Sequence, residues 1–137
     1  MSGSLKITLK LDVSGPLADG RAERAVETWQ ERTTQALADE AVEMLGAFPM
    51  DKSGRSHGGF RENLHPVRQT RAAVTVPGPM IEGVTWAPWL EGTSKRNAST
   101  GFRGYHLFRT TRRDLDQRAA GTGERVLRDV ISEMGGQ

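Results

Sequence analysis

The residues most capable of acid–base or metal chemistry are few, and their spacing matches no familiar site. The three histidines are His57, His65 and His106, and the first two fit no metal-binding pair on one helix face. The chain has no cysteine, which excludes disulfides, thiolate metal sites and a cysteine nucleophile. Glu40 and Glu43 share a predicted helix, where paired carboxylates are more often a solvated face than an acid–base pair. We therefore expect no catalytic residue, no metal and no cofactor, and predict that the chain is not an enzyme.

A basic stretch between Gly92 and Arg113 is the other feature that could bind a ligand or a partner. It has no acidic residue, and aromatic residues lie among its cations, which are Lys95, Arg96, Arg103, Arg109, Arg112 and Arg113. One interpretation is contact with phosphate groups of DNA, with Lys95, Arg96 and Arg103 as the candidate residues. The other is pairing with acidic residues of a neighbouring subunit. The sequence leaves both open.

The elements that would position this stretch follow from periodicity. Apolar and polar residues alternate over 5–13, which predicts a strand with one buried face. Apolar residues then recur at helical spacing from Asp19, a plausible N-cap, until Pro49, which predicts an amphipathic helix of about 28 residues. Residues 50–67 read as a long irregular loop.

The second half of the chain predicts a hairpin followed by a helix. Residues 70–76 alternate again, Pro77-Gly78-Pro79 forms a turn, and residues 80–86 are expected to pair with 70–76. A short helical turn over 87–93 should close at Gly92, and a second extended loop should cover 94–104. The C-terminal segment predicts one kinked helix or two short ones, interrupted near Gly121-Thr122-Gly123.

These elements predict one α+β domain over residues 1–137. A small antiparallel sheet, built from 5–13, 70–76 and 80–86, should be covered by the long N-terminal helix and the C-terminal helix, with long protruding loops. Only 36% of the residues are hydrophobic, so the core should be thin and partly completed by partner subunits. No apolar run is long enough for a membrane span, so we expect no membrane partner and assembly in a cytoplasm.

One segment resembles a family signature. The run Val84-Thr85-Trp86-Ala87-Pro88-Trp89-Leu90-Glu91-Gly92-Thr93 resembles the Y-A-x-Y-L-E-x-G-T stretch of phage tail-completion, or head–tail joining, proteins. The run Gly104-Tyr105-His106-Leu107-Phe108-Arg109, which opens the last helix, also resembles members of this family. The residue between Glu and Gly-Thr is absent here, Pro49–Gly54 matches the family's P-V-D-T-G only approximately, and its R-P-F-L-x-P-A motif is missing.

The resemblance implies a structural virion protein at the head–tail neck of a long-tailed bacteriophage. Its implied partners are copies of itself in a ring, expected to number six, the head-completion and portal-side proteins, the tail tube or tail terminator protein, and passing genomic DNA. The candidate residues for the subunit interface are Trp86, Trp89, Glu91, Arg55, Phe60, Arg61, Lys95, Arg96, Phe102, Arg103 and Tyr105. Glu91 is expected to cap Thr93 or the amides that follow it.

Two other classes of function stay open. The chain could be a tail terminator or a minor capsid subunit of the same particle. Its small size, its basic stretch and its lack of cysteine also fit a nucleic-acid-binding module or a small ribonuclease toxin.

Overall fold

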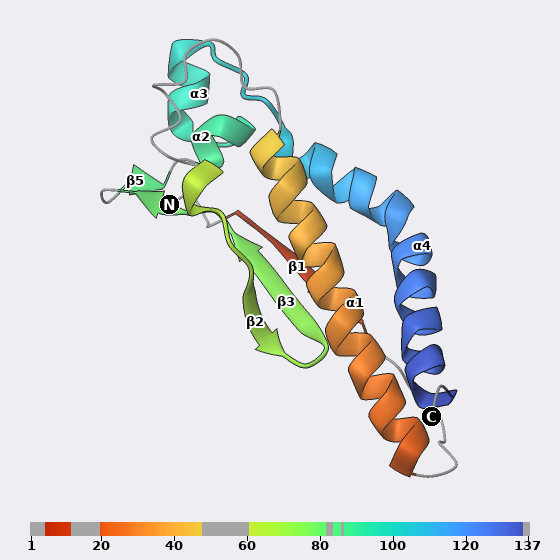
Figure 1. Ribbon diagram of the computed structural model, residues 1–137. Coiled ribbons are helices and arrows are strands. Elements are labelled where there is room, and N and C mark those ends of the chain that lie inside the picture. The colour runs from red at the N-terminus through yellow and green to blue at the C-terminus, as the bar shows by residue number, and fades with distance from the viewer. Residues whose placement is uncertain (1–4, 12–19, 48–60, 82–83, 86, 136–137) are drawn as a thin grey trace.

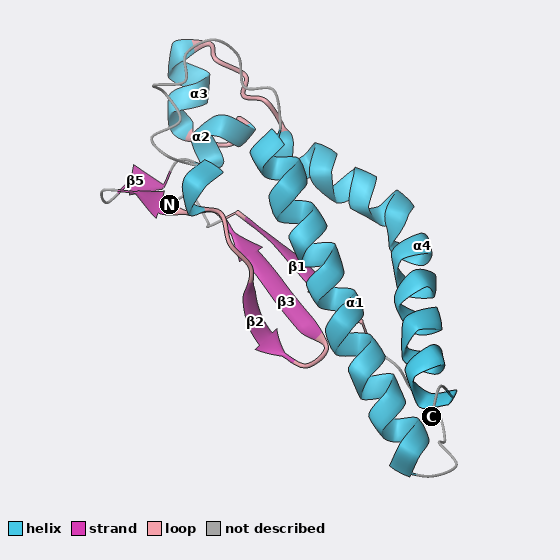
Figure 2. Cartoon of the chain, in the orientation of Figure 1, coloured by secondary structure: helices cyan, strands magenta, loops and turns pink. Residues whose placement is uncertain are grey.

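The computed structural model describes residues 5–11, 20–47, 61–81, 84–85 and 87–135 (Figure 1). The predicted α+β class is confirmed: a three-stranded antiparallel sheet is accompanied by four α-helices within these residues (Figure 2). The strands are β1 (Lys6–Lys10), β2 (Val67–Thr70), β3 (Ala73–Pro77), β4 (Met80–Ile81) and β5 (Val84–Thr85). The helices are α1 (Gly20–Ala47), α2 (Ala87–Glu91), α3 (Lys95–Thr100) and α4 (Leu107–Gly135), and a 3-10 turn, η2, covers Arg61–Asn63.

The sheet has the order β1-β3-β2, which differs in one strand from the prediction. Strand β3 pairs antiparallel with β1, Thr8 opposite Thr75, and with β2, Val67 opposite Thr75. The predicted strand 70–76 is only partly borne out, because β3 begins at Ala73, residues 71–72 form a tight turn, and Thr70 is the last residue of β2. Strand β2 contains Arg68 and Gln69 and has little apolar alternation, because it lies at the sheet edge.

The predicted pairing of 80–86 with 70–76 is wrong. Strands β4 and β5 pair only with each other, Met80 opposite Thr85, in a separate two-stranded sheet. The physical reason is that β3 already has a neighbour on each side, and Gly78 N–H extends the pairing with β1 by donating to Leu5 O at 2.8 Å. No edge of β3 is left for the segment that follows the turn.

Helix α1 crosses one face of the sheet, and α4 runs beside it (Figure 1). The predicted long first helix is confirmed at 28 residues. The core lies between the sheet, α1, α2 and the first half of α4. The largest fully buried side chains are Leu45, Leu90, Leu107, Val74, Val76, Thr34 and Thr111.

Helix α4 is one continuous helix that changes direction part-way along its length (Figure 1). The sequence left open one kinked helix or two short ones, and the first alternative is confirmed. Trp29 of α1 donates its indole N–H to Gly123 O at 2.9 Å, and Thr122 donates its hydroxyl to Glu40 at 3.0 Å. Both bonds fix the glycine-containing part of α4 against α1.

The two predicted loops have different outcomes. Residues 94–104 are not an extended loop, since α3 occupies Lys95–Thr100. Of the predicted loop 50–67, residues 50–60 lie outside the described residues, and the remainder contains η2 and the start of β2.

Candidate interface at the α2–α3 corner

Residues 87–106, here called the α2–α3 corner, bring together several of the predicted interface residues. The corner lies at the end of the molecule where α1 ends and α4 begins (Figure 1). The rings of Trp89 and Phe102 have centroids 4.6 Å apart, and those of Phe102 and Tyr105 are 5.3 Å apart. The Arg96 guanidinium lies over Trp89, 5.6 Å from the ring centroid. Aromatic and cation–π contacts of this kind give the corner a defined shape.

A buried asparagine organises the interior of the corner. Asn97 donates its amide to Trp89 O at 3.0 Å and to Phe102 O at 2.9 Å. Its side-chain oxygen accepts the backbone N–H of Ser94 at 2.9 Å. These bonds tie α3 to the chain on both sides of it. Asn97 is not among the residues predicted from the sequence, although a Ser followed by a polar residue at the third position is typical of a helix start.

Glu91 is buried and caps the last helix, so its place among the candidate interface residues is corrected. Its side chain is only 4% exposed. One carboxylate oxygen accepts the N–H of Phe108 at 2.7 Å, and the other accepts the N–H of Arg109 at 3.1 Å. The carboxylate thus stabilises the first turn of α4, whose amides have no partner within the helix. The sequence predicted that Glu91 caps Thr93 or the next amides, and the structure corrects this: the amides that it accepts lie 17 and 18 residues further along, in the first turn of α4.

Two glycines allow the two ends of the corner to touch. Gly92 and Gly104 have φ values of +102° and +82°. A Cβ on Gly104 would lie 2.3 Å from the Gly92 nitrogen, and one on Gly92 would lie 2.1 Å from Arg103 O. The backbone of Tyr105 also donates to Leu90 O at 2.6 Å. The left-handed turn expected at Gly92 is therefore present, and backbone packing closes the corner.

The cations of the basic stretch remain on the surface. Lys95, Arg96 and Arg103 are exposed on the corner, and Arg109 and Arg112 are exposed on the first turns of α4. The six cations of residues 92–113 carry +6, and because the chain totals +2, the remaining residues carry −4. The corner and the start of α4 together thus carry a positive charge, while the remaining residues are net negative. This distribution favours phosphates or an acidic protein surface.

The side chains of four other candidate interface residues are not described. Trp86, Arg55 and Phe60 lie outside the described residues. Arg61 begins η2, and its side chain is not described.

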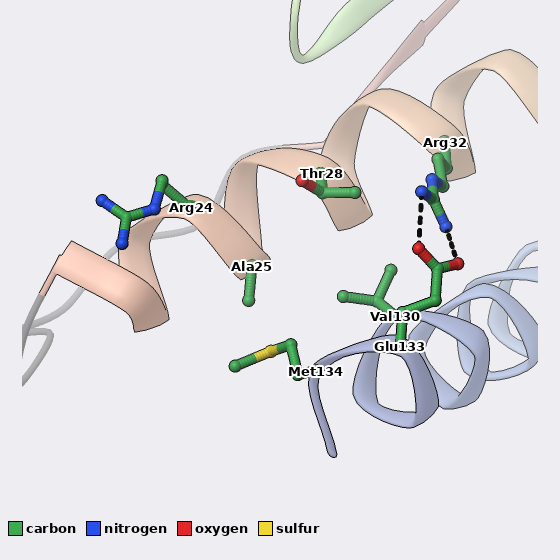
Figure 3. Close-up of a pocket in the computed structure, with 7 residues that line it drawn as sticks. All are labelled: Arg24, Ala25, Thr28, Arg32, Val130, Glu133 and Met134. Atoms are coloured by element: carbon green, nitrogen blue, oxygen red, sulfur yellow. Dashed lines mark hydrogen bonds and ion pairs between the residues drawn. The ribbon is translucent and has the colours of Figure 1, made fainter. Parts of the chain in front are cut away.

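A hollow lies at the opposite end of the paired helices, between α1 and α4 (Figure 3). Ala25, Val130 and Met134 give it an apolar lining, and Arg32 and Glu133 pair with each other at one side of it. Arg32 donates two hydrogen bonds to Glu133, one of them at 2.9 Å. This hydrogen-bonded pairing lowers the pKa of Glu133 and raises the pKa of Arg32. The pair is exposed and joins two helices, which is a structural contact.

Within the described residues, no three His, Asp or Glu side chains gather closely enough to hold a metal ion. In the same part of the chain, no helix combines the length and apolar character needed to cross a membrane.

Fold and site together define a small α+β domain with an aromatic and basic corner, which is held by hydrogen bonds from Asn97 and Glu91. No protein-family model matches the chain, and no curated protein and no solved structure matches it either.

Proposed function

We propose that the chain is a non-enzymatic structural subunit of the head–tail neck of a long-tailed bacteriophage. Copies of it form a ring, of six, that joins the portal-side head-completion proteins to the tail tube or its terminator. It assembles in the host cytoplasm and ends in the virion. The observation that carries the proposal is the α2–α3 corner, which contains most of the segment resembling the tail-completion signature.

The construction of the corner supports an assembly role. Glu91 and Asn97 anchor it through buried hydrogen bonds, while Lys95, Arg96 and Arg103 remain exposed. A rigid surface loses little conformational entropy when a partner docks, so its contacts are retained as affinity. A ring needs such a surface on every copy, facing a different surface of the next copy.

The most direct test is deletion of the gene from the element that encodes it, followed by electron microscopy of the lysate. The proposal predicts DNA-filled heads and complete tails that stay separate, and joined particles once the gene is supplied in trans. Normal joined particles without the gene would refute it. Immunogold labelling of joined particles separates a neck subunit from a minor capsid subunit, because only the former places label where head and tail meet.

Nucleic-acid binding is the second candidate, favoured by exposed cations beside the aromatic rings of Trp89 and Phe102. This second candidate includes a nucleic-acid-binding module, a ribonuclease toxin, and a neck ring that contacts passing DNA. It predicts affinity for a DNA or RNA duplex that falls steeply with salt, and a smaller salt slope after Lys95→Ala with Arg103→Ala. An unchanged slope in this variant would exclude the corner as the binding surface. Cleavage of RNA would favour the toxin.

A further inference from the structure

The second half of α1 is an acidic surface without a cation of its own. Residues 33–47 contain Asp39, Glu40 and Glu43 and no lysine or arginine. Glu40 is half-buried and accepts the hydroxyl of Thr122 in α4 at 3.0 Å. Asp39 and Glu43 are exposed one helical turn apart, a spacing at which like charges destabilise a helix. No cation among the described side chains forms an ion pair with either of these two carboxylates.

The α2–α3 corner has the opposite charge and is likewise uncompensated. Its only acidic residue, Glu91, is buried against the amides of α4. Lys95, Arg96 and Arg103 are exposed, and none of them is in an ion pair with a described acidic side chain. The Arg96 guanidinium lies over the half-buried ring of Trp89. Arginine and tryptophan are the residue types that most often dominate the binding energy of a protein interface.

The two surfaces lie at the same end of the molecule, because α1 ends beside the corner (Figure 1). They do not compensate each other within one copy, since no ion pair among the described residues joins the corner to α1. Copies related by rotation about a common axis stand side by side at the same level. The corner of one copy can therefore meet the second half of α1 in the next copy.

The charges favour this contact over a two-fold dimer. If the corner met the corner of a second copy, cations would lie opposite cations, and contact of α1 with α1 would place Asp39 and Glu43 opposite the same carboxylates. Like charges across an interface suppress a pairing, whereas opposite charges steer it and fix its orientation. Opposite charges meet only when each copy uses two different surfaces, which is the heterologous contact that closes a ring.

We propose that the corner of one copy docks on the second half of α1 in the next copy, with its exposed cations opposite Asp39 and Glu43. The charges set the orientation, and Trp89 and Phe102 supply apolar contact beside them. This inference rests on the proposed function and names the two surfaces through which copies in the ring meet.

Exchange of charge between the two surfaces is the test, with the full chain throughout. The corner variant is Lys95→Glu with Arg103→Glu, and the helix variant is Asp39→Lys with Glu43→Lys. Each variant alone has like charges on both surfaces. Its association constant, measured by sedimentation velocity at low salt, should fall at least about ten-fold below that of the natural chain. An equimolar mixture should recover to within about three-fold of the natural chain, because each variant then meets its opposite charge on the other.

A matched control separates the contact from the effect of net charge. Arg24→Glu with Arg125→Glu has the same net charge as the corner variant, and both arginines are exposed outside the two surfaces. We expect this control to associate like the natural chain. Circular dichroism should be the same for all variants, since every substituted side chain is exposed. A variant that had lost its fold could not restore association in the mixture, so the mixture also tests folding.

Two results would overturn the inference. The first is a natural chain that stays monomeric at about millimolar concentration and low salt; if it then bound a DNA duplex through the corner, the occupant would be nucleic acid. The second is undiminished association of either variant alone, or a mixture that stays monomeric.

The gene-deletion test of the neck role does not depend on which surfaces meet. Separate heads and tails after deletion, together with a monomeric natural chain, would overturn this inference alone. Joined particles without the gene, together with association restored in the mixture, would overturn the neck role alone.

Discussion

Glu91 joins α2 to the first turn of α4 through its side chain. It lies next to the turn at Gly92, and its two oxygens accept the first amides of α4, 17 and 18 residues further along the chain. A buried carboxylate in this position satisfies two helix donors and places negative charge at the positive end of the helix dipole. The residue that the family resemblance highlights therefore has a clear structural task.

Substitution Glu91→Ala should lower the free energy of unfolding by about 3 kcal/mol, because two buried amides lose a charged acceptor. Urea denaturation measures this. Glu43→Ala is the matched control, since Glu43 is exposed on α1, and it should change the free energy by about 0.5 kcal/mol or less. Equal effects of the two substitutions would show that the Glu91 contacts do not stabilise the corner.

A pair of glycine substitutions tests the closure of the corner. Gly104→Ala adds a Cβ 2.3 Å from a backbone nitrogen at a positive φ, and should lower the free energy of unfolding by at least about 2 kcal/mol. Gly121→Ala adds a Cβ with no neighbour within 4 Å inside α4. It should raise the free energy by up to about 1 kcal/mol, through helix propensity. Thermal denaturation would contradict the account if both variants moved in the same direction.

Among the helices and strands, the sequence predicts the ones that bury a periodic apolar face. Helix α1 and strand β1 are of this kind, and α2 is marked by its closing glycine. Strand β2 and helix α3 were missed because their residues, VRQT and KRNAST, have no apolar periodicity. Strand β2 is held by hydrogen bonds to distant residues, as when Arg68 donates to Glu31 O at 2.9 Å, whereas α3 is held by the bonds of Asn97 to Trp89 and Phe102.

The residues of the candidate site were likewise only partly predictable from the sequence. The gathering of Trp89, Arg96, Phe102 and Tyr105 followed from residue type and closeness in sequence, so these candidates could be chosen in advance. The roles of Glu91 and Asn97 could not, because each depends on which backbone groups the fold brings to its side chain.

The pairing of α1 with α4 has a predictable dependence on pH. The hydrogen bond from Arg32 lowers the pKa of Glu133, so the ionised carboxylate stabilises the folded state. This contribution is fully present above the unfolded pKa of about 4.3 and is lost as pH falls through the lower folded pKa of Glu133. We therefore expect Tm to be lower in Glu133→Gln than in the natural chain at neutral pH, and the difference to vanish in acid. A difference that is constant with pH would contradict this.

At the scale of the whole molecule, charge is distributed unevenly. The six cations of residues 92–113 lie on the corner and on the start of α4, while the remaining residues are net negative. Such separation steers association and favours one orientation over others.

The proposed role requires that the exposed cations of the corner contact a partner during head–tail joining. The measurement is the fraction of joined particles when the deleted gene is complemented by Lys95→Glu with Arg96→Glu and Arg103→Glu. The control reverses three exposed cations elsewhere, Arg24, Arg125 and Arg128, and so has the same change in net charge. We predict that the corner variant folds but leaves heads and tails separate, while the control restores joined particles. Equal joining by both variants would contradict the account.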